Sequence, residues 1–414
     1  MKKLKVLLVS EYFPPKIFGG GEISAYNLAK SLAEKRVDVF VLTTNFKDLR
    51  IFEEKDGFKI IRTLKTGNNP SLIIENLKRF LYFQKSLKKE ILKIDKKENF
   101  DVVHFLNTTS IPSFKINKKT IATINGYTNF CPKRNLFYKE QNVCSGCSFN
   151  KFIYCILNSE FIGKTRMKFY LKYNPFFWLF LYFNYKRKNN DLKNINKFIA
   201  ISDFIKYLLL KNDVKERSIC KIPNIVDINK TGKHFDIKEK GIIISYVGSL
   251  EKAKGVEMLV KAFNKVDSEA KLLIFGSGSQ RKYLEKISNE NIKFFGSVDY
   301  KFIPSIYKQT NIFVQPALWP EPLSRVMIEA LFFGKPIIAT NNGGNIEGVI
   351  DGKNGFLINS EKELKEKLEK LIKNKNLRKK MSLKSKKLFE EKFSKNKMVY
   401  KHKNILKNNY KKRR

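Results

Sequence analysis

The chain alternates short apolar runs with stretches in which apolar residues recur at helical spacing. The run "LKVLLVS" (4–10) leads through a glycine-rich loop to residues 22–36, where apolar positions fall every three or four residues. The next run, "VDVFVLTT" (37–44), again has the length and composition of a buried strand. The beginning of the chain therefore predicts a strand–helix–strand unit.

Similar runs continue this scheme through both halves of the chain. They lie at 101–107, 119–125 and 197–202, and again at 241–249, 271–279, 291–298, 311–316 and 335–340. Short runs that are apolar at nearly every position are typical of parallel strands, which are buried on both faces. We therefore predict an α/β protein with two doubly wound, Rossmann-like parallel sheets.

A chain of 414 residues exceeds the usual size of one hydrophobic core, so two domains are expected. The polar, turn-rich stretch 221–241 predicts domains over 1–225 and 226–394, followed by a basic C-terminal tail over 395–414. Residues near 126–192 have poor periodicity and are interpreted as an insertion in the first domain. Because ligands bind outside the carboxyl ends of the strands in such sheets, the loops of both domains are expected to face one cleft.

Charge is the unusual feature of the composition. The chain contains 82 Lys and Arg against 39 Asp and Glu, a formal net charge of +43. Such an excess favours anionic partners, namely nucleic acid, acidic lipid headgroups or phosphorylated substrates, although a lysine-rich coding bias would also contribute. Since 43% of the residues are hydrophobic, the chain is expected to fold.

The apolar runs are too short to cross a membrane. The N-terminal run reaches polar Ser10 without a cleavage site, and the longest run, "FFWLFLYF" (176–183), has eight residues against the roughly 18 to 20 that a spanning helix needs. We therefore expect a cytoplasmic protein whose thiols are reduced.

Two basic segments favour attachment to a membrane surface. Residues 166–188 flank the aromatic run with cations, and residues 395–414 contain nine Lys and Arg and no acid. This composition is typical of peripheral binding to an anionic membrane, here the inner face of the cell membrane. The alternative interpretation is a solvated lysine face and a buried aromatic helix.

Two glycine-rich loops are candidates for close approach to a ligand. Gly19, Gly20 and Gly21 stand where the first strand gives way to the first helix, whose N-terminus favours a phosphate; a plain tight turn is the alternative. "GSGSQR" (276–281) begins with Gly276, but Arg281 stands where a dinucleotide fingerprint has its third glycine. A nicotinamide-dependent dehydrogenase is therefore disfavoured.

Charged residues mark two further loops. Lys252 and Lys254 precede a helix in "VGSLEKAKG" (247–255), where they could neutralise a diphosphate leaving group. Glu321 lies between two prolines, and Glu329 lies within a predicted helix. Two carboxylates so placed suit two hydroxyl-bearing parts of one extended ligand, with helix N–H groups between them for its phosphates. From spacing alone, solvated lysines, a helix cap and a surface glutamate are equally good interpretations.

The order and separation of these motifs, together with "GKPIIATNNGGNIEGVIDGKNGFLI" (334–358), resemble glycosyltransferase family 4, the retaining enzymes of group 1 with the GT-B fold. The resemblance covers nearly the whole chain, and the element from Glu321 to Glu329 is its most specific part. It implies a nucleotide-sugar donor in the second domain and an acceptor in the first, with no cofactor or metal needed for catalysis.

The resemblance also implies roles for single residues. The carboxylate of Glu321 would contact the donor sugar, and that of Glu329 would bind the ribose hydroxyls. The glycine loop would close over the donor from the first domain. The diphosphate would be held by the amides of Leu323 and Ser324 and by the charge of Lys254.

Two positions depart from the family pattern. The arginine that usually follows the glycine of the "VG" element is replaced by Ser249, for which Lys252 could substitute as a point charge. The histidine that many members carry after the strand ending in "TIN" corresponds to Asn125, which can orient a sugar hydroxyl but cannot titrate. Both departures weaken the case for catalysis. The resemblance nevertheless implies that Asn125 acts beside Glu321 at the catalytic centre.

Histidine and cysteine supply the remaining candidates. His104 ends a predicted strand at the edge of the cleft, where it is a candidate acceptor contact; a buried core histidine is the alternative. The cysteines at 131, 144, 147 and 155 include one C-x-x-C pair, which allows either a structural zinc site or free thiols in a small core. Disulfides are disfavoured in a reducing compartment.

The function predicted from the sequence is a retaining, hexosyltransferase-type glycosyltransferase that acts on a glycan or lipid-linked acceptor in polysaccharide or glycoconjugate synthesis. The alternatives are a family member that binds the donor with little transfer and a GT-B-like epimerase. A basic nucleic-acid-binding protein is a third class, suggested by the net charge alone, and specific nucleic-acid binding is not expected because no recognition motif is present.

Overall fold

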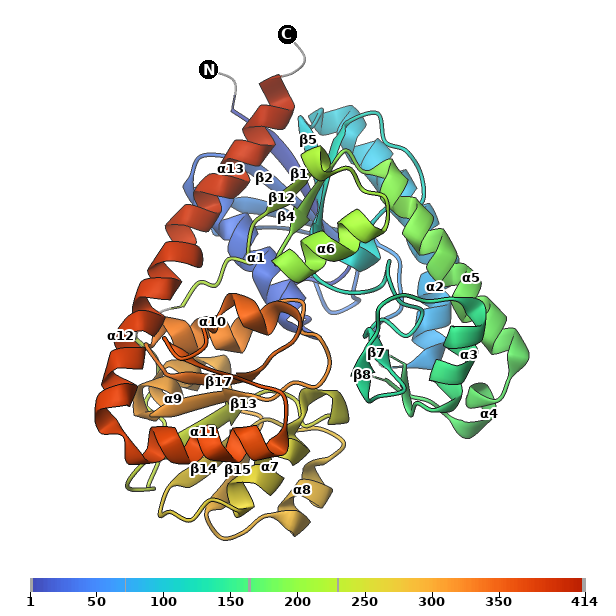
Figure 1. The fold of residues 1–414 in the computed structure, drawn as a ribbon. Coiled ribbons are helices and arrows are strands. Elements are labelled where there is room, and N and C mark those ends of the chain that lie inside the picture. Colours follow the sequence, from blue (N-terminus) through green and yellow to red (C-terminus); the bar gives the residue numbers. More distant parts are fainter. Residues whose placement is uncertain (1–2, 71, 163–164, 229–230, 412–414) are drawn as a thin grey trace. The chain divides into compact units, whose positions relative to one another are not determined.

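The computed structural model describes residues 3–70, 72–162, 165–228 and 231–411, and these form two compact units. The first unit contains the chain up to Lys139, Cys144–Ile225 and the segment that begins at Lys395. The second unit contains Glu140–Val143 and Val226–Ser394. Figure 1 shows the elements of both units, and each unit is described by itself.

The first unit is built on an eight-stranded sheet with the strand order β12-β11-β6-β5-β1-β2-β4-β3. All neighbours are parallel except β3 and β4, which form a hairpin. Its turn contains Asp56 and Gly57, both with positive φ, as a two-residue hairpin loop requires. The strands are β1 (Lys5–Val9), β2 (Asp38–Thr44), β3 (Phe52–Lys55), β4 (Phe58–Leu64), β5 (Val102–Phe105), β6 (Lys119–Ile124), β11 (Lys197–Ala200) and β12 (Ile219–Lys221).

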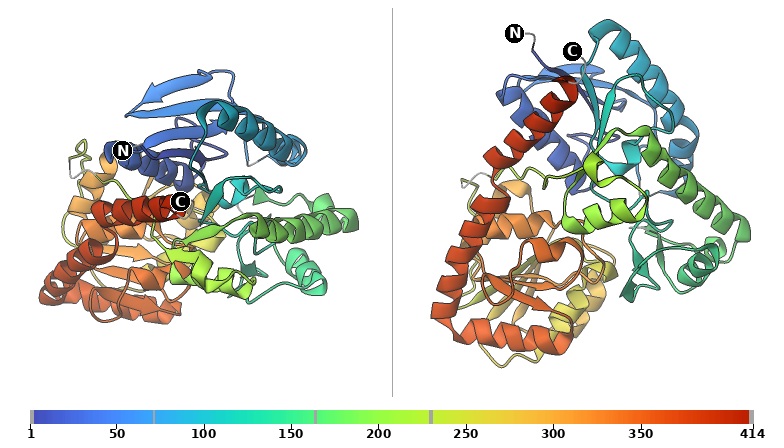
Figure 2. Two further views of the ribbon diagram at one scale, coloured as in Figure 1. Left: turned by 90° about the horizontal axis from the view of Figure 1, so that it is seen from above. Right: turned by 45° about the horizontal axis from the view of Figure 1, so that its top comes forward.

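Helices cover this sheet because each has an apolar stripe that must be buried. α1 (Gly20–Glu34) packs beside α13 (Lys395–Lys411), and both contribute to the core that contains Val6, Leu8 and Val41. Figure 2 shows these two helices side by side. α2 (Ile73–Glu98) packs against β4, and α6 (Asp203–Lys211) packs against β11 and β12.

The prediction of a separate basic tail over 395–414 is wrong for residues 395–411, while residues 412–414 lie outside the described part. The segment forms α13, and Met398, Val399 and Leu406 on this helix are almost fully buried in the first core. These apolar residues keep helical spacing between the lysines, so burial of one face outweighs the basic composition.

The irregular segment 126–192 joins β6 to β11, which are neighbours in the sheet. Its described residues, 126–162 and 165–192, contain four strands of two residues each: β7 (Phe137–Tyr138), β8 (Asn142–Val143), β9 (Phe161–Ile162) and β10 (Thr165–Arg166). Its helices are α3 (Phe149–Leu157), α4 (Phe169–Lys172) and α5 (Pro175–Asn190). A small cluster of Phe152, Ile156 and Leu181 forms its core.

The second unit contains a six-stranded parallel sheet with the order β15-β14-β13-β16-β17-β18. The strands are β13 (Ile243–Val247), β14 (Lys271–Phe275), β15 (Ile292–Gly296), β16 (Ile312–Gln315), β17 (Ile337–Thr340) and β18 (Gly355–Ile358). The helices are α7 (Val256–Asn264), α8 (Arg281–Ile287), α9 (Ile303–Gln309), α10 (Arg325–Phe332), α11 (Glu361–Lys373) and α12 (Lys375–Lys392). The predicted class, two doubly wound α/β units, is confirmed.

None of the helices in the described ranges has both the length and the apolar composition that crossing a bilayer requires.

Candidate active site

The strand order of the second unit determines where a ligand is expected to bind. From β13 the chain proceeds to β14 and β15 on one side and then returns to β16 on the other side. In open α/β sheets, ligands bind outside the carboxyl ends of the strands at such a reversal. The loop after β13 carries Ser249, Lys252 and Lys254, and the loop after β16 carries Glu321.

These two loops bring Lys254 and Glu321 into contact. The ammonium of Lys254 forms an ion pair with Oε1 of Glu321, and the indole N–H of Trp319 donates to the same oxygen at 2.8 Å. Lys254 also lies over the Trp319 ring, 4.9 Å from its centroid. Glu321 is only 6% exposed. Lys254 and Trp319 therefore hold Oε1 of its carboxylate in place before any ligand binds.

Close backbone contacts hold the loops in place. Gly255 has φ of 67°, and a Cβ atom there would lie 1.9 Å from the carbonyl oxygen of Pro316. Gly276 has φ of 147°, and a Cβ atom there would lie 1.8 Å from the carbonyl oxygen of Gly248. Any other residue at either position would push the loops apart, so these glycines keep the loops after β13, β14 and β16 in contact.

Ser249 and Lys252 contribute differently to the loop after β13. The carbonyl of Ser249 accepts a hydrogen bond from the hydroxyl of Tyr246 at 2.9 Å, which fixes the backbone directly after the strand. Lys252 is exposed and begins the 3-10 turn that ends at Lys254. Its ammonium lies 3.9 Å from Oε2 of buried Glu140, and about half of the side chain is exposed to solvent.

The N-terminus of α10 lies directly after Glu321 in the chain. Ser324 is its N-cap, and the hydroxyl of Ser324 accepts from the backbone N–H of Met327 at 3.4 Å. The first backbone N–H groups of a helix have no acceptor within the helix, so they favour an anion. Leu323 and Ser324 are buried beside this end, and the N–H of Gly344 donates to the carbonyl of Glu321 at 2.5 Å.

Glu329 is fixed by three side chains that the sequence did not identify. Its Oε1 accepts from the hydroxyl of Tyr300 at 3.0 Å and from Nε of Arg325 at 2.9 Å. Its Oε2 lies 3.3 Å from the hydroxyl of Tyr307, which shares its single proton with the nearer carbonyl of Val326 at 2.9 Å. Glu329 is 2% exposed. Because an ionised carboxylate offers about four acceptor positions, these bonds leave room for one further donor.

Burial and the charge of Glu329 alter the protonation of its neighbours. The pKa of Tyr300 is raised to about 12, first by burial and then by the nearby carboxylate. The pKa of Tyr307 is raised for the same two reasons. Burial alone would lower the pKa of Arg325, but the adjacent Glu329 outweighs it and raises this pKa. Both phenols therefore stay protonated and donate hydrogen bonds at neutral pH.

A cavity of about 450 Å³ opens beside this carboxylate. Glu329, Tyr300 and Phe333 line it together with Asp227 and Lys233. Its volume is in the range of small-molecule sites, and its walls combine apolar side chains with a few charged groups. The cavity therefore has space for a small organic ligand next to the carboxylate of Glu329.

The first unit has a corresponding position between β1 and β5. The chain proceeds from β1 to β2 on one side and later adds β5 and β6 on the other, so the carboxyl ends of β1 and β5 border the reversal. Asn125 follows β6 here and donates from Nδ2 to the carbonyl of Leu106 at 3.2 Å. A Cβ atom on Gly21 would lie 3.4 Å from this Nδ2, so the glycine loop and Asn125 are adjacent.

The glycine loop leads into the first turn of α1. Gly19 is the N-cap, and its N–H donates to the carboxylate of Glu22 at 2.9 Å. Gly20 is the first residue of the helix. The loop therefore presents a helix N-terminus beside Asn125, although one acid already occupies part of it.

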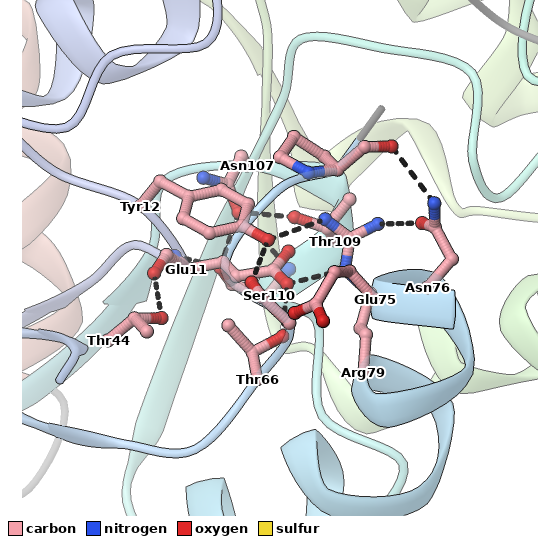
Figure 3. Close-up of polar contacts among 12 residues, drawn as sticks. Glu11, Tyr12, Thr44, Thr66, Glu75, Asn76, Arg79, Asn107, Thr109 and Ser110 are labelled. Carbon is pink, nitrogen blue, oxygen red and sulfur yellow. Dashed lines mark hydrogen bonds and ion pairs between the residues drawn. The ribbon is translucent and has the colours of Figure 1, made fainter. Parts of the chain in front are cut away.

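A buried polar network lies at the same edge of the first sheet (Figure 3). Glu11, directly after β1, is fully buried and pairs with Nε of Arg79 on α2, while the hydroxyl of Thr66 donates to its Oε1 at 2.7 Å. Arg79 also donates to the hydroxyl of Tyr12 at 3.3 Å. Burial and the Glu11 carboxylate raise the pKa of Tyr12 to about 12. This network fixes the loop after β1 against α2.

Comparison with known protein families decides between the interpretations of this chain. The family described as Glycosyl transferases group 1 matches residues 227–388, and Glycosyltransferase Family 4 matches residues 18–230, which is more than half of the chain.

The chain belongs to glycosyltransferase family 4.

Two known proteins are similar in sequence to this glycosyltransferase, one over most of the chain and one over less than half of it. An uncharacterized glycosyltransferase of Methanocaldococcus jannaschii, MJ1069, is 28% identical over 401 residues, which cover 92% of each chain. The capsular polysaccharide biosynthesis glycosyltransferase CapM of Staphylococcus aureus is 30% identical over 204 residues, covering 44% of this chain and 53% of CapM. About half of this group 1 glycosyltransferase is therefore similar to a glycosyltransferase of capsular polysaccharide biosynthesis.

The fold of the glycosyltransferase is also that of solved structures. Anabaena Alr3699/HepE, crystallised with UDP and glucose, superimposes with a TM-score of 0.65 and 15% identity, covering 98% of this chain and all of that one. At this identity the likeness concerns the fold, which is GT-B.

The prediction that His104 contacts an acceptor is wrong. In the glycosyltransferase, His104 lies within β5, is fully buried, and shares a hydrogen bond of 2.8 Å between Nε2 and the hydroxyl of Thr123. Its ring lies 6.1 Å from that of His402 on α13. The sequence could not reveal this because the covering helix is some 300 residues away, in the segment interpreted as a tail.

The buried histidine pair predicts acid sensitivity of the fold. Burial lowers the pKa of His402 to about 4, and burial and then His402 lower that of His104 well below 6.5. Both rings are thus neutral in the folded state, whereas the unfolded chain takes up protons below about pH 6.5. The free energy of unfolding should therefore fall as the pH is lowered, by about 2 kcal/mol for His402 between pH 7 and pH 5, and His104 should act in the same direction.

Urea denaturation of the wild-type chain, His402→Leu and His234→Gln at pH 7 and pH 5 checks this expectation. The His402→Leu variant should lose less stability on acidification than the wild type, and the variant of exposed His234 should lose the same amount. Equal losses in all three proteins would contradict the role assigned to the buried pair.

The four clustered cysteines of the glycosyltransferase line one small cavity of about 20 Å³, and all are free thiols. Burial and the three neighbouring thiols raise the pKa of Cys147 to about 12. Within the described ranges, no group of three or more His, Cys, Asp or Glu side chains is arranged to hold a metal ion. A structural zinc ligated by Cys131, Cys144, Cys147 and Cys155 stays a prediction, which metal analysis of the purified protein would test.

Sequence reasoning missed the residues that support the two carboxylates. Trp319 stands two positions before Glu321, and Arg325 stands four before Glu329, which is the spacing of a helical ion pair. These two partners could have been found from spacing. Tyr300 and Tyr307 come from other elements, and nothing in the local sequence connects them with Glu329.

Proposed function

We propose that the chain is a retaining, hexosyltransferase-type glycosyltransferase that moves a sugar from a nucleotide-sugar donor to a glycan or lipid-linked acceptor. The observation that carries this proposal is the contact between Lys254 and Glu321 at the strand reversal, directly before the N-terminus of α10. The arrangement brings a cation, free helix N–H groups and a carboxylate together at the carboxyl end of the sheet. These groups match the diphosphate and the sugar of such a donor.

The diphosphate is the part of the donor whose charge grows as the glycosidic bond breaks. We propose that the amides of Leu323 and Ser324 and the ammonium of Lys254 stabilise that charge. Lys254 is held by Glu321 and Trp319, so it is oriented before the donor arrives. Lys252, which is exposed in the same loop, supplies a second cation near Ser249.

Glu321 is proposed to contact the donor sugar and Glu329 the ribose. The open acceptor position on Glu329 suits one ribose hydroxyl, and the cavity of about 450 Å³ beside it accommodates part of a nucleoside. Gly276 keeps the turn after β14 in contact with the loop after β13. In this proposal, the backbone of that turn lies next to the base of the nucleotide. The UDP in the Anabaena HepE complex supports a nucleoside diphosphate as the carrier.

The first unit is proposed to bind the acceptor. Asn125 and the loop of Gly19, Gly20 and Gly21 are adjacent at its strand reversal, and an amide there can orient a sugar hydroxyl. The name of CapM supports a role in cell-surface polysaccharide synthesis. A cytoplasmic enzyme that works at the inner face of the membrane is part of this proposal.

Product analysis tests the reaction. The purified chain is incubated with nucleotide sugars, with and without a glycan acceptor, and nucleoside diphosphate release is followed together with the anomeric configuration of the product by NMR. We expect release that depends on acceptor and a product with the anomeric configuration of the donor. Inverted product would contradict retention, and equal release without acceptor would favour a donor-hydrolysing or epimerase-like activity.

A further inference from the structure

The aromatic run at 176–183 is only partly buried. It lies within α5, of which Leu181 alone is classed as buried, at 9% exposure. Phe176 is 82% exposed and Phe183 is 65% exposed, and Leu179 between them is also exposed. These three residues are spaced by three and four positions, so they form one stripe along the helix. The alternative of a buried aromatic helix holds for the opposite face only, where Phe177, Trp178, Phe180 and Tyr182 pack against the small core.

The exposed stripe continues onto α4. Phe169 is 78% exposed, and Tyr170 and Tyr173 are exposed beside it. The indole N–H of Trp178 on α5 donates to the carbonyl of Lys172 at 2.9 Å, which fixes α4 against α5. We call the six exposed residues the aromatic patch: Phe169, Tyr170, Tyr173, Phe176, Leu179 and Phe183.

A second apolar stripe lies on the neighbouring helix α2. Ile74, Leu77 and Leu81 are exposed and again keep spacings of three and four. The rings of Phe80 on α2 and Phe180 on α5 are 5.0 Å apart, so the two helices are in contact (Figure 1). Single exposed apolar residues are common on soluble proteins, but contiguous large ones mark an interaction surface.

The charged residues of the segment that carries the aromatic patch are all positive. Residues 166–188 contain six Lys and Arg and no acidic residue. Lys168 lies over the ring of Tyr170, and Lys172 lies over that of Tyr173, so cations and aromatic rings alternate at the same surface. Lys186 lies over Tyr182 at the other end of α5.

We propose that the aromatic patch is a docking surface for an anionic lipid bilayer. Exposed Phe side chains would enter the boundary between headgroups and acyl chains, where Tyr is also favoured, while Lys and Arg would contact acidic headgroups. Charge alone would also attract nucleic acid, but such binding needs no continuous apolar stripe of Phe and Leu. The combination of apolar and cationic side chains on one surface favours lipid.

Docking would bring the acceptor side of the enzyme to its substrate. The patch, Asn125 and the glycine loop all belong to the first unit, which is proposed to bind the acceptor. A lipid-linked acceptor is confined to the membrane surface, so an enzyme held there would meet it at high local concentration. The docking surface itself does not depend on the proposed reaction.

Vesicle flotation with the full chain tests the proposal. Vesicles of phosphatidylcholine with about 30% phosphatidylglycerol are compared with pure phosphatidylcholine vesicles at about 0.1 M salt. The patch variant is F169Q/F176Q/F183Q. The matched control is Y207Q/L383Q/Y400Q, which replaces three other exposed apolar residues, on α6, α12 and α13.

We expect the wild type and the control to float with the anionic vesicles, and the patch variant to bind at least about tenfold more weakly. Thermal unfolding of the three proteins checks that each is folded. Equal binding of the patch variant, or no binding of the wild type to anionic vesicles, would overturn the proposal. So would a wild-type dimer that becomes monomeric in the patch variant, because the patch would then join two copies of this chain. No donor is present, so the result is independent of the proposed transfer reaction.

Discussion

Replacing Glu321 with glutamine is expected to lower kcat by about 10³-fold while nucleoside diphosphate affinity changes little. Glutamine keeps an oxygen that can accept from Trp319, so the loop should stay in place. It removes the negative charge that holds Lys254. In the proposed mechanism the same charge stabilises the positive charge that develops on the sugar. An effect confined to turnover is what a group acting mainly in the transition state produces.

Steady-state kinetics and calorimetric titration with nucleoside diphosphate measure the two quantities separately. Glu285→Gln is the matched control, because Glu285 is a partly exposed carboxylate on α8 of the same unit. It should retain wild-type turnover. If Glu321→Gln also retained wild-type turnover, Glu321 would have no role in the chemistry.

Replacing Glu329 with alanine is expected to have two effects, on stability and on donor affinity. Arg325, Tyr300 and Tyr307 would lose their common acceptor, and breaking one side of a buried ion pair costs about 3 kcal/mol of stability. Loss of the ribose contacts should weaken nucleotide binding by about 100-fold. A lowered unfolding temperature in this variant is therefore not by itself evidence about donor binding.

The Glu329→Gln variant separates the two effects. Its side-chain oxygen still accepts from Arg325 or Tyr300, so its stability should lie closer to that of the wild type. Titration calorimetry below the unfolding temperature then reports nucleotide affinity of folded protein. Glu369→Ala, which removes an i,i+4 ion pair on α11, is the control. Unchanged affinity in both Glu329 variants would remove Glu329 from the donor site.

Much of the sheet architecture follows from local pattern. Each apolar run that was predicted to be a strand contains a parallel strand, from β1 at Lys5–Val9 to β17 at Ile337–Thr340. Runs buried on both faces are apolar at nearly every position, which makes them visible without knowledge of the neighbours. The observed strands are one to four residues shorter than the runs, and β13 and β14 together lose most of these residues at their carboxyl ends, where the chain enters the loops of the candidate site.

The elements that were missed have weaker or interrupted patterns. β4 alternates buried and half-buried residues, which is less conspicuous than a continuous run, although Asp56–Gly57 before it is a recognisable hairpin signal. In α13, lysines separate the buried residues Met398 and Leu406, so composition concealed the helix. A positive net charge describes the surface and does not exclude a buried face.

Some residues of the candidate site could also be predicted from the local sequence, and others could not. Glu321 and Lys254 could be singled out because a loop after a strand is recognisable locally, and Ser324 was singled out through the family resemblance. Their partners depend on contacts across the sheet, as when Tyr307 on α9 reaches Glu329 on α10. The network around Glu11 and Arg79 joins residues 68 positions apart and was likewise not visible in the sequence.

The measurement that tests the central claim most directly is the thermal unfolding of the purified wild-type chain with UDP-, GDP- and ADP-sugars. A ligand that binds only the folded state raises the unfolding temperature, here by about 5 °C or more at saturating concentration. We expect one nucleotide series to produce this shift and the others to produce little. No shift with any nucleotide sugar would contradict a donor site formed by Lys254, Glu321 and Glu329.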